Sequence, residues 1–90
     1  MKNLTNEERA LFMSLHRRHG RRNSNFCVCE GLRFCREIYS LRPDLVRKAF
    51  CLKGMDTGFF KGLAFSEISE AELGEISHTV NPQGIVFLVE

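Results

Sequence analysis

The chain has 90 residues, of which 43% are hydrophobic and 27% are charged, and this size and composition limit it to one globular domain. Its first residues contain no apolar segment typical of a secretion signal, and no apolar run approaches the ~20 residues that a membrane helix needs. We therefore expect a cytoplasmic protein with no membrane partner, whose four Cys are reduced and buried.

Charge is unevenly divided along the chain. Residues 1–48 hold eleven Lys and Arg against five Asp and Glu, whereas residues 49–90 hold two against six. We expect an anionic partner to bind the basic half. The acidic half argues against a protein that contacts nucleic acid on every side.

The first predicted element is a helix over about residues 6–18, ending near Gly20. A capping box at its start is predicted by Thr5 as the N-cap and Glu8 three residues into the helix. Apolar residues then recur at helical spacing, at Leu11, Phe12 and Leu15. This pattern is typical of a helix that packs one face on a core.

A basic run over residues 16–22 is the strongest functional signal in the chain. Its members are His16, Arg17, Arg18, His19, Arg21 and Arg22. Guanidinium groups donate paired hydrogen bonds to phosphates, so the run predicts a surface that binds RNA or DNA. A solvated helix end, with Arg17 and Arg18 complementing the helix dipole, would contain the same residues.

An apolar stretch at residues 26–29 follows and predicts a short strand buried on both faces. Glu30 and Gly31 end it, and a helix is predicted over about residues 32–41. The apolar face of that helix consists of Phe34, Cys35, Ile38, Tyr39 and Leu41. Strand, glycine turn and helix open a βαβ unit. We expect Glu30 to cap this helix or to pair with an Arg, and a catalytic carboxylate is the alternative.

The remainder of the chain predicts three more strands and one more helix. In order these are a strand over 46–52, a surface loop over 53–62, a short strand within 63–68, a helix over about 70–77 and a strand over 85–89. A capping box at Ser69 and Glu72 opens the helix, and Asn81 to Gly84 form either a plain turn or a ligand loop. The fully apolar last strand should lie in the centre of the sheet. Because a central strand ends one residue before Glu90, we expect these residues to be the first domain of a longer protein.

Two other chemistries are less favoured interpretations. Cys27 and Cys29 point to one face of a strand, but the spacings to Cys35 and Cys51 do not match a usual zinc site, so we predict no metal. A nucleophilic Cys needs a neighbouring base, and the sequence places none of the three His beside one. The chain also lacks Gly-rich phosphate-binding motifs. We predict no catalytic residues.

The order of these segments resembles the N-terminal substrate-binding domain of the SpoU/TrmH family of RNA 2′-O-ribose methyltransferases. That family has a basic helix end, then Phe and Glu-Gly before a helix, and later Leu-Ser-x-Thr-x-x-Pro-Gln-Gly-Ile before a final strand. This chain has Arg22, then Phe26 to Gly31, and later Ile76 to Ile85, with Ile76 in place of Leu. The resemblance covers about residues 11–90.

The resemblance implies an α/β fold, a three-layer α/β/α sandwich with a small mixed sheet, similar to kink-turn-binding ribosomal proteins. It implies one substrate-binding domain, with a helix and basic segment over 1–25 and an α/β core over 26–90. Its expected partner is structured ribosomal or transfer RNA. The RNA-binding residues would be Arg17, Arg18, Arg21, Arg22 and Arg33, and the signature turns Glu30, Gly31, Pro82, Gln83 and Gly84.

In this family a knotted domain that follows the present one binds S-adenosylmethionine, transfers the methyl group and forms the usual homodimer. These 90 residues contain no counterpart of that domain. We therefore expect the chain itself to bind RNA without a cofactor and without methylating it, and S-adenosylmethionine to bind only in the full-length parent. The alternatives are a free-standing, non-catalytic RNA-binding domain, a protein-interaction domain whose basic run faces solvent, and a zinc-binding module.

Overall fold

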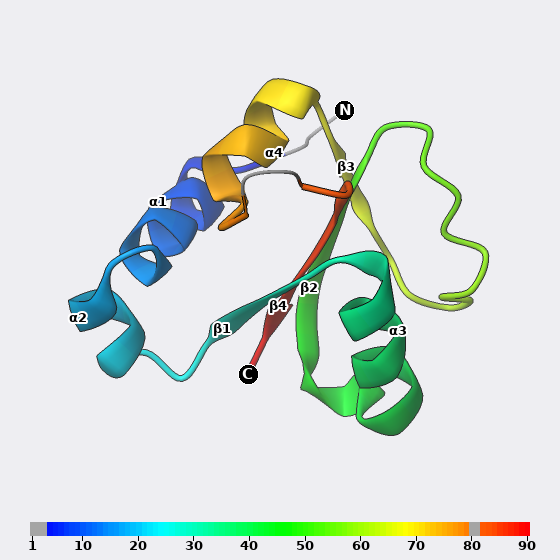
Figure 1. The fold of residues 1–90 in the computed structure, drawn as a ribbon, viewed down its shortest axis with the longest axis horizontal. Helices are drawn as coiled ribbons and strands as arrows, with labels where there is room; N and C mark the ends of the chain where they lie inside the picture. The colour runs from blue at the N-terminus through cyan, green and yellow to red at the C-terminus, as the bar shows by residue number, and fades with distance from the viewer. Residues whose placement is uncertain (1–3, 80–81) are drawn as a thin grey trace.

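A computed structural model describes residues 4–79 and 82–90 and contains a four-stranded mixed sheet with helices on both faces (Figure 1). The strands are β1 (Cys27–Glu30), β2 (Val46–Leu52), β3 (Ser66–Ile68) and β4 (Ile85–Val89). The helices are α1 (Asn6–Leu15), α2 (Arg18–Arg22), α3 (Leu32–Leu41) and α4 (Glu70–Ile76), with a 3₁₀ turn η1 (Pro43–Leu45). None of the helices in the described residues has the length and apolar character of a membrane span.

The sheet has the strand order β1-β4-β2-β3. β4 lies between β1 and β2 and runs antiparallel to both, and β3 pairs with β2 in parallel. β1 and β2 therefore run in the same direction, and α3 connects them as the crossover helix of a split βαβ unit. All five residues of β4 are buried, which confirms its predicted central position.

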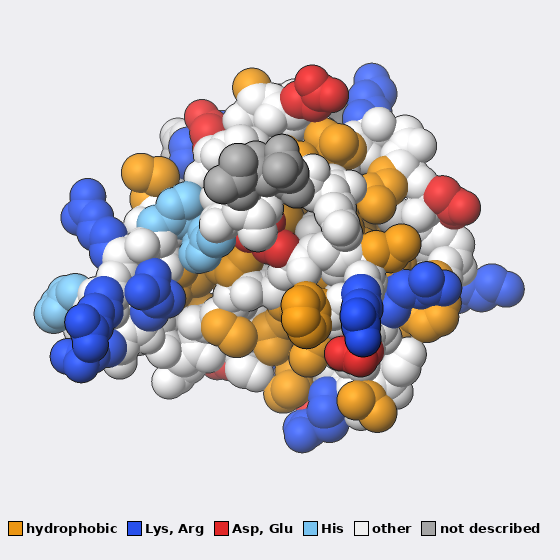
Figure 2. Space-filling view, viewed as in Figure 1, with side chains coloured by type: hydrophobic (Ala, Val, Ile, Leu, Met, Phe, Trp, Pro, Cys, Tyr) orange, Lys and Arg blue, Asp and Glu red, His pale blue; other side chains and the backbone are white. Residues whose placement is uncertain are grey.

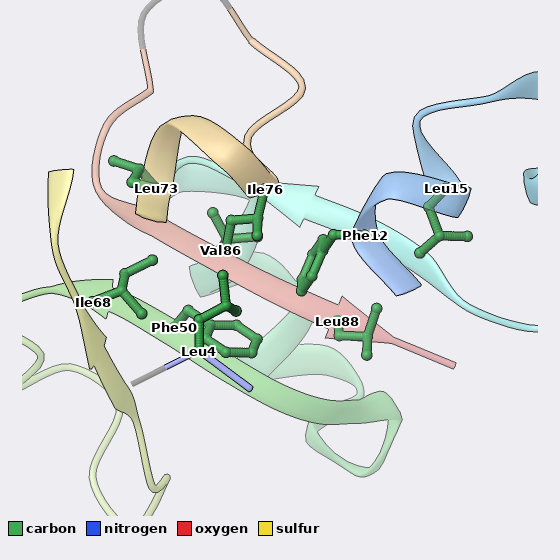
Figure 3. Close-up of a cluster of buried hydrophobic side chains, with 9 residues drawn as sticks. All are labelled: Leu4, Phe12, Leu15, Phe50, Ile68, Leu73, Ile76, Val86 and Leu88. Atoms are coloured by element: carbon green, nitrogen blue, oxygen red, sulfur yellow. The ribbon is translucent and has the colours of Figure 1, made fainter. Parts of the chain in front are cut away.

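The alternation of side chains along β4 divides the core into two halves. Val86 and Leu88 face α1 and α4, where they pack with Phe12 and Phe50 in the cluster shown in Figure 3. Ile85, Phe87 and Val89 face α3 and pack around Cys35 and Phe60. The predicted three-layer α/β/α sandwich is therefore confirmed, whereas the likeness to kink-turn-binding proteins stays a prediction.

Local sequence signals set most of the element boundaries. The backbone N–H of Glu8 donates to Thr5 Oγ1 (3.0 Å), and the Thr5 N–H donates to Glu8 Oε1 (2.9 Å). Ser69 and Glu72 form the same reciprocal pair at the start of α4. Both predicted capping boxes are confirmed, as are the predicted bounds of α3, β2 and β4.

The helix predicted over residues 6–18 is wrong at its C-terminal end. α1 ends at Leu15, Arg17 has an extended backbone (φ −99°, ψ 143°), and α2 begins at Arg18. Arg21 explains the break, because its Nη1 donates to the carbonyl oxygens of Leu15 (3.1 Å) and His16 (3.0 Å). A side chain of α2 thus satisfies the last carbonyls of α1, and Arg17 and Arg18 lie outside its last turn.

Two predicted burial patterns are also wrong. β1 starts one residue later than predicted and lies at the edge of the sheet, so that Cys27 is exposed rather than buried on both faces. On α3, Phe34 and Leu41 are 61% and 76% exposed. They are seven residues apart and so share a side of the helix turned away from the sheet, while Cys35 packs against it.

Gly74 lies exposed within α4, and a Cβ built there meets no atom within 4 Å. Replacing a helical Gly by Ala removes an entropic cost of about 0.5–1 kcal/mol. We expect Gly74→Ala to raise the free energy of unfolding, measured in urea, by this amount. Gly20→Ala should lower it, because a Cβ there would lie 2.1 Å from the Ser14 carbonyl oxygen. The opposite order of the two variants would contradict the packing of α1, α2 and α4.

Candidate functional site

The two signature turns meet at one end of the sheet, because β1 and β4 are antiparallel neighbours. Glu30, the last residue of β1, lies opposite Val86 near the start of β4. Across this junction the Leu32 N–H donates to Gln83 Oε1 (2.9 Å). Gln83 therefore caps the N-terminus of α3, the role that the sequence assigned to Glu30.

Gly31 sits at this junction in a conformation that favours glycine. Its backbone has φ +92° and ψ 146°, a region that residues with a Cβ rarely adopt. A Cβ at this position would also lie 3.3 Å from Gln83 Oε1. The Gly31 N–H donates to the carbonyl oxygen of Ile85 (3.2 Å), which ties the turn to β4.

Glu30 holds the chain that follows α4. Its carboxylate accepts hydrogen bonds from Ser77 Oγ (2.7 Å), from the backbone N–H of His78 and, at 3.5 Å, from Thr79 Oγ1. Glu30 is structural, as predicted, but the predicted partners are wrong. Gln83 takes the capping position at α3, and no ion pair joins Glu30 to an Arg among the described residues. We call Glu30, Gly31, Ser77, His78, Thr79 and Gln83 the turn cluster.

A hollow of about 290 Å³ opens beside the turn cluster and is lined by Glu30, Gly31, Arg33, Phe34, Thr79 and Gln83. Phe34 forms its apolar wall and is largely exposed. An exposed aromatic ring beside a guanidinium is a surface on which an unpaired nucleobase can stack. The sequence assigned Phe34 to the core, so only the structure identifies it as a candidate site residue.

The predicted RNA-binding arginines Arg17, Arg18, Arg21 and Arg22 lie on α2 and its N-cap, and we call them the basic corner. All four are exposed. Figure 2 shows Lys and Arg side chains gathered over α2 and again over α3 on one face of the molecule. Arg21 is the member that meets the turn cluster, because it lines a second hollow with His16, Ser77, His78 and Thr79.

Pro82 and Gly84 flank Gln83 in the second signature turn. Pro82 is exposed and Gly84 is buried, while Asn81 lies outside the described residues.

Two histidines complete this surface: His16, which the sequence placed in the basic run without predicting that it binds RNA, and His78. The rings of His16 and His78 pack edge to face, with their centroids 4.0 Å apart. Burial lowers the pKa of His78, and the nearby His16 and Arg21 lower it further, while the Glu30 carboxylate opposes them. The folded state therefore favours the neutral His78 ring. As pH falls below the ordinary pKa of histidine, the unfolded state takes up the proton first, so the free energy of unfolding decreases. The sequence signal that could have identified His78 is its position between Ser77 and Thr79 in the second signature segment.

The four thiols are not equally buried. Cys27 is exposed, which corrects the prediction of four buried Cys, Cys29 is half-buried, and Cys35 and Cys51 are buried. The Cys35 thiol donates to the Cys29 carbonyl oxygen (3.5 Å). Hydrogen bonding to Cys35 lowers the pKa of Cys29, whereas the same pairing and burial raise the pKa of Cys35. Over residues 4–79 and 82–90, no group of three His, Cys, Asp or Glu could hold a metal ion.

These environments predict selective alkylation of the folded chain. Iodoacetamide at pH 8 should modify Cys27 and Cys29 and leave Cys35 and Cys51 unmodified until the chain is unfolded, because the thiolate is the reactive form and needs access. Mass spectrometry of tryptic peptides would measure this. Modification of Cys35 as fast as Cys27 would contradict the packing of α3 on the sheet.

Comparisons with known proteins agree with this architecture. A family model described as the MRM3-like substrate binding domain matches residues 11–86. A solved structure from Porphyromonas gingivalis, described as an RNA methyltransferase of the TrmH family, aligns with a TM-score of 0.73 at 16% identity, covering 99% of this chain and 36% of that one. A search among curated proteins found no match. The resemblance that the two signature turns suggested is confirmed.

Proposed function

Because this chain belongs to the family of MRM3-like substrate-binding domains, we propose that it is the RNA-recognition domain of a TrmH-family RNA 2′-O-ribose methyltransferase. One observation supports RNA as its substrate above all. Arg21 of the basic corner, the turn cluster and the exposed Phe34 lie around two hollows that share Thr79. Phosphate-binding groups and a stacking surface are thus adjacent, as single-stranded or looped RNA requires.

In this proposal the chain holds RNA and does not react with it. Arginines of the basic corner and Arg33 bind phosphates and fix the orientation of the RNA, while the shape of the fold supplies most of the selectivity. A separate domain binds S-adenosylmethionine and transfers the methyl group, and no step of that transfer is assigned to the residues described above. A separate recognition domain contributes positioning, because a ribose held in the correct orientation reacts in an effectively unimolecular step.

The test is direct binding of structured RNA to the 90-residue chain. Fluorescence anisotropy of labelled ribosomal and transfer RNA hairpins would measure the affinity. We expect binding that weakens as salt rises, with a slope of about −3 to −4 in log K against log salt if four arginines contact phosphates. Absence of binding at low salt would reject the proposal and favour a protein-interaction domain. Equal binding of an RNA hairpin and a DNA hairpin of the same sequence would reject selectivity for RNA.

A further inference from the structure

The hollow between the basic corner and the turn cluster has a chemistry of its own. It measures about 400 Å³ and is lined by His16, Arg21, Ser77, His78 and Thr79, which we call the histidine pocket. These residues come from the C-cap of α1, from α2 and from the segment after α4. Side chains far apart in the sequence therefore converge here, and most of them can carry a positive charge or donate a hydrogen bond.

The histidine pocket is partly preorganised. Arg21 is anchored through Nη1 to the carbonyl oxygens of Leu15 and His16, at 3.1 and 3.0 Å. A guanidinium has further N–H groups on Nε and Nη2, so it can bind a ligand at the same time. The His16 and His78 rings pack edge to face at 4.0 Å, and Glu30 holds the His78 backbone N–H. The pocket thus needs little rearrangement to receive a small ligand.

We propose that the histidine pocket binds a phosphate group of the RNA backbone, an inference that rests on the proposed function. An anion fits better than a metal ion, because the fixed positive charge of Arg21 repels a cation. A phosphate oxygen accepts from both guanidinium and imidazolium groups, and such charge-assisted bonds are the strong ones. Thr79 lines both this pocket and the hollow beside Phe34, so a phosphate held here would place the adjoining nucleotide near that ring.

The charges around the pocket explain why an anion would be stabilising. Burial, His16 and Arg21 all lower the pKa of His78, and Glu30 is the acid that opposes them. Glu30 is already engaged by Ser77 and the His78 backbone. A bound phosphate would offset the repulsion that His16 and Arg21 exert on His78 and would favour the protonated His78 ring. Phosphate binding should therefore strengthen as pH falls through the range in which His78 takes up a proton.

Histidine NMR tests the pocket without any RNA. Inorganic phosphate would be added to the ¹³C-labelled chain at pH 6 and constant ionic strength, and the ring resonances of the three His followed. We expect His16 and His78 to shift saturably, with an upward shift in the pKa of His78, while His19, which is exposed on α2 beside Asn23, moves much less. Equal shifts of all three rings, or no shifts, would overturn the proposal.

A second arm separates the pocket from the proposed function. We expect the double variant His16→Gln/His78→Gln to bind a ribosomal RNA hairpin about five- to tenfold more weakly at pH 6 and to lose most of the pH dependence of binding. Lys61→Gln, in the loop after β2, is the control and should bind as the wild type does. Wild-type affinity in the double variant would overturn the pocket and leave RNA recognition intact. Phosphate shifts without binding of the RNA hairpin would reject the proposed function and would show that the pocket takes a free phosphate rather than one of RNA.

Discussion

Reversing the charge of the basic corner, by replacing Arg17, Arg18, Arg21 and Arg22 with Glu, is expected to weaken binding of structured RNA by at least ~100-fold at 0.15 M monovalent salt. Each phosphate contact contributes about fourfold to sixfold under these conditions through counterion release. Four lost contacts account for that factor, and the new negative charges add repulsion. All four side chains are exposed, so no core contact is lost with them. Fluorescence anisotropy with a labelled hairpin would measure the change.

Arg21 requires a separate variant, since it also binds the last carbonyls of α1. A triple variant that retains Arg21 (Arg17→Glu, Arg18→Glu and Arg22→Glu) should lose most of the affinity while unfolding in urea as the wild type does. The matched control changes as many charges elsewhere, at Arg42, Arg47 and Lys61. Equal RNA affinity in the wild type and the triple variant would show that Arg17, Arg18 and Arg22 do not contact the RNA.

Replacing Glu30 with Ala is expected to lower the free energy of unfolding by about 3 kcal/mol. Its carboxylate accepts hydrogen bonds from Ser77 and from the His78 backbone, and hydrogen bonds to charged groups contribute about 1.5–3 kcal/mol each. Ser77 is buried, and without Glu30 its hydroxyl would have only Thr79 left as a partner, with contacts at 3.2 and 3.3 Å. Urea denaturation at pH 7 would measure the loss.

Two further variants make the Glu30 experiment specific. Glu30→Gln keeps the shape of the side chain but lacks the charge, and it should fall between the wild type and Glu30→Ala. Glu37→Ala, at an exposed position of α3, should change the free energy of unfolding by less than about 0.5 kcal/mol. Wild-type stability of Glu30→Ala would mean that the carboxylate does not hold residues 77–79 in place.

The sequence predicted those features that depend on neighbours in the chain. The capping boxes at Thr5 and Ser69 join residues three positions apart, and the apolar run of β4 needed no partner to be read as a central strand. The break between α1 and α2 could not be predicted in the same way, because a side chain from α2 causes it. The exposure of Cys27 depends on the strand order, which places β1 at the edge.

For the candidate site, the sequence supplied the parts but not their assembly. It named the basic corner, Arg33 and both signature turns. It could not show that Gln83 caps α3 or that Glu30 holds His78, because antiparallel pairing of β1 with β4 brings these residues together. Neither His16 nor Phe34 was predicted to bind RNA, for opposite reasons. His16 lies in a run dominated by arginines, and the helical spacing of Phe34 is that of a core residue.

The most direct test of RNA recognition by this face is backbone NMR of the ¹⁵N-labelled chain during titration with a structured RNA hairpin. The account predicts that amide resonances shift on α2, over residues 30–34 and over residues 77–79, where the basic corner, Phe34 and the turn cluster lie. Shifts confined to η1, the start of β2 and the loop before β3 would place the RNA on another face and contradict it.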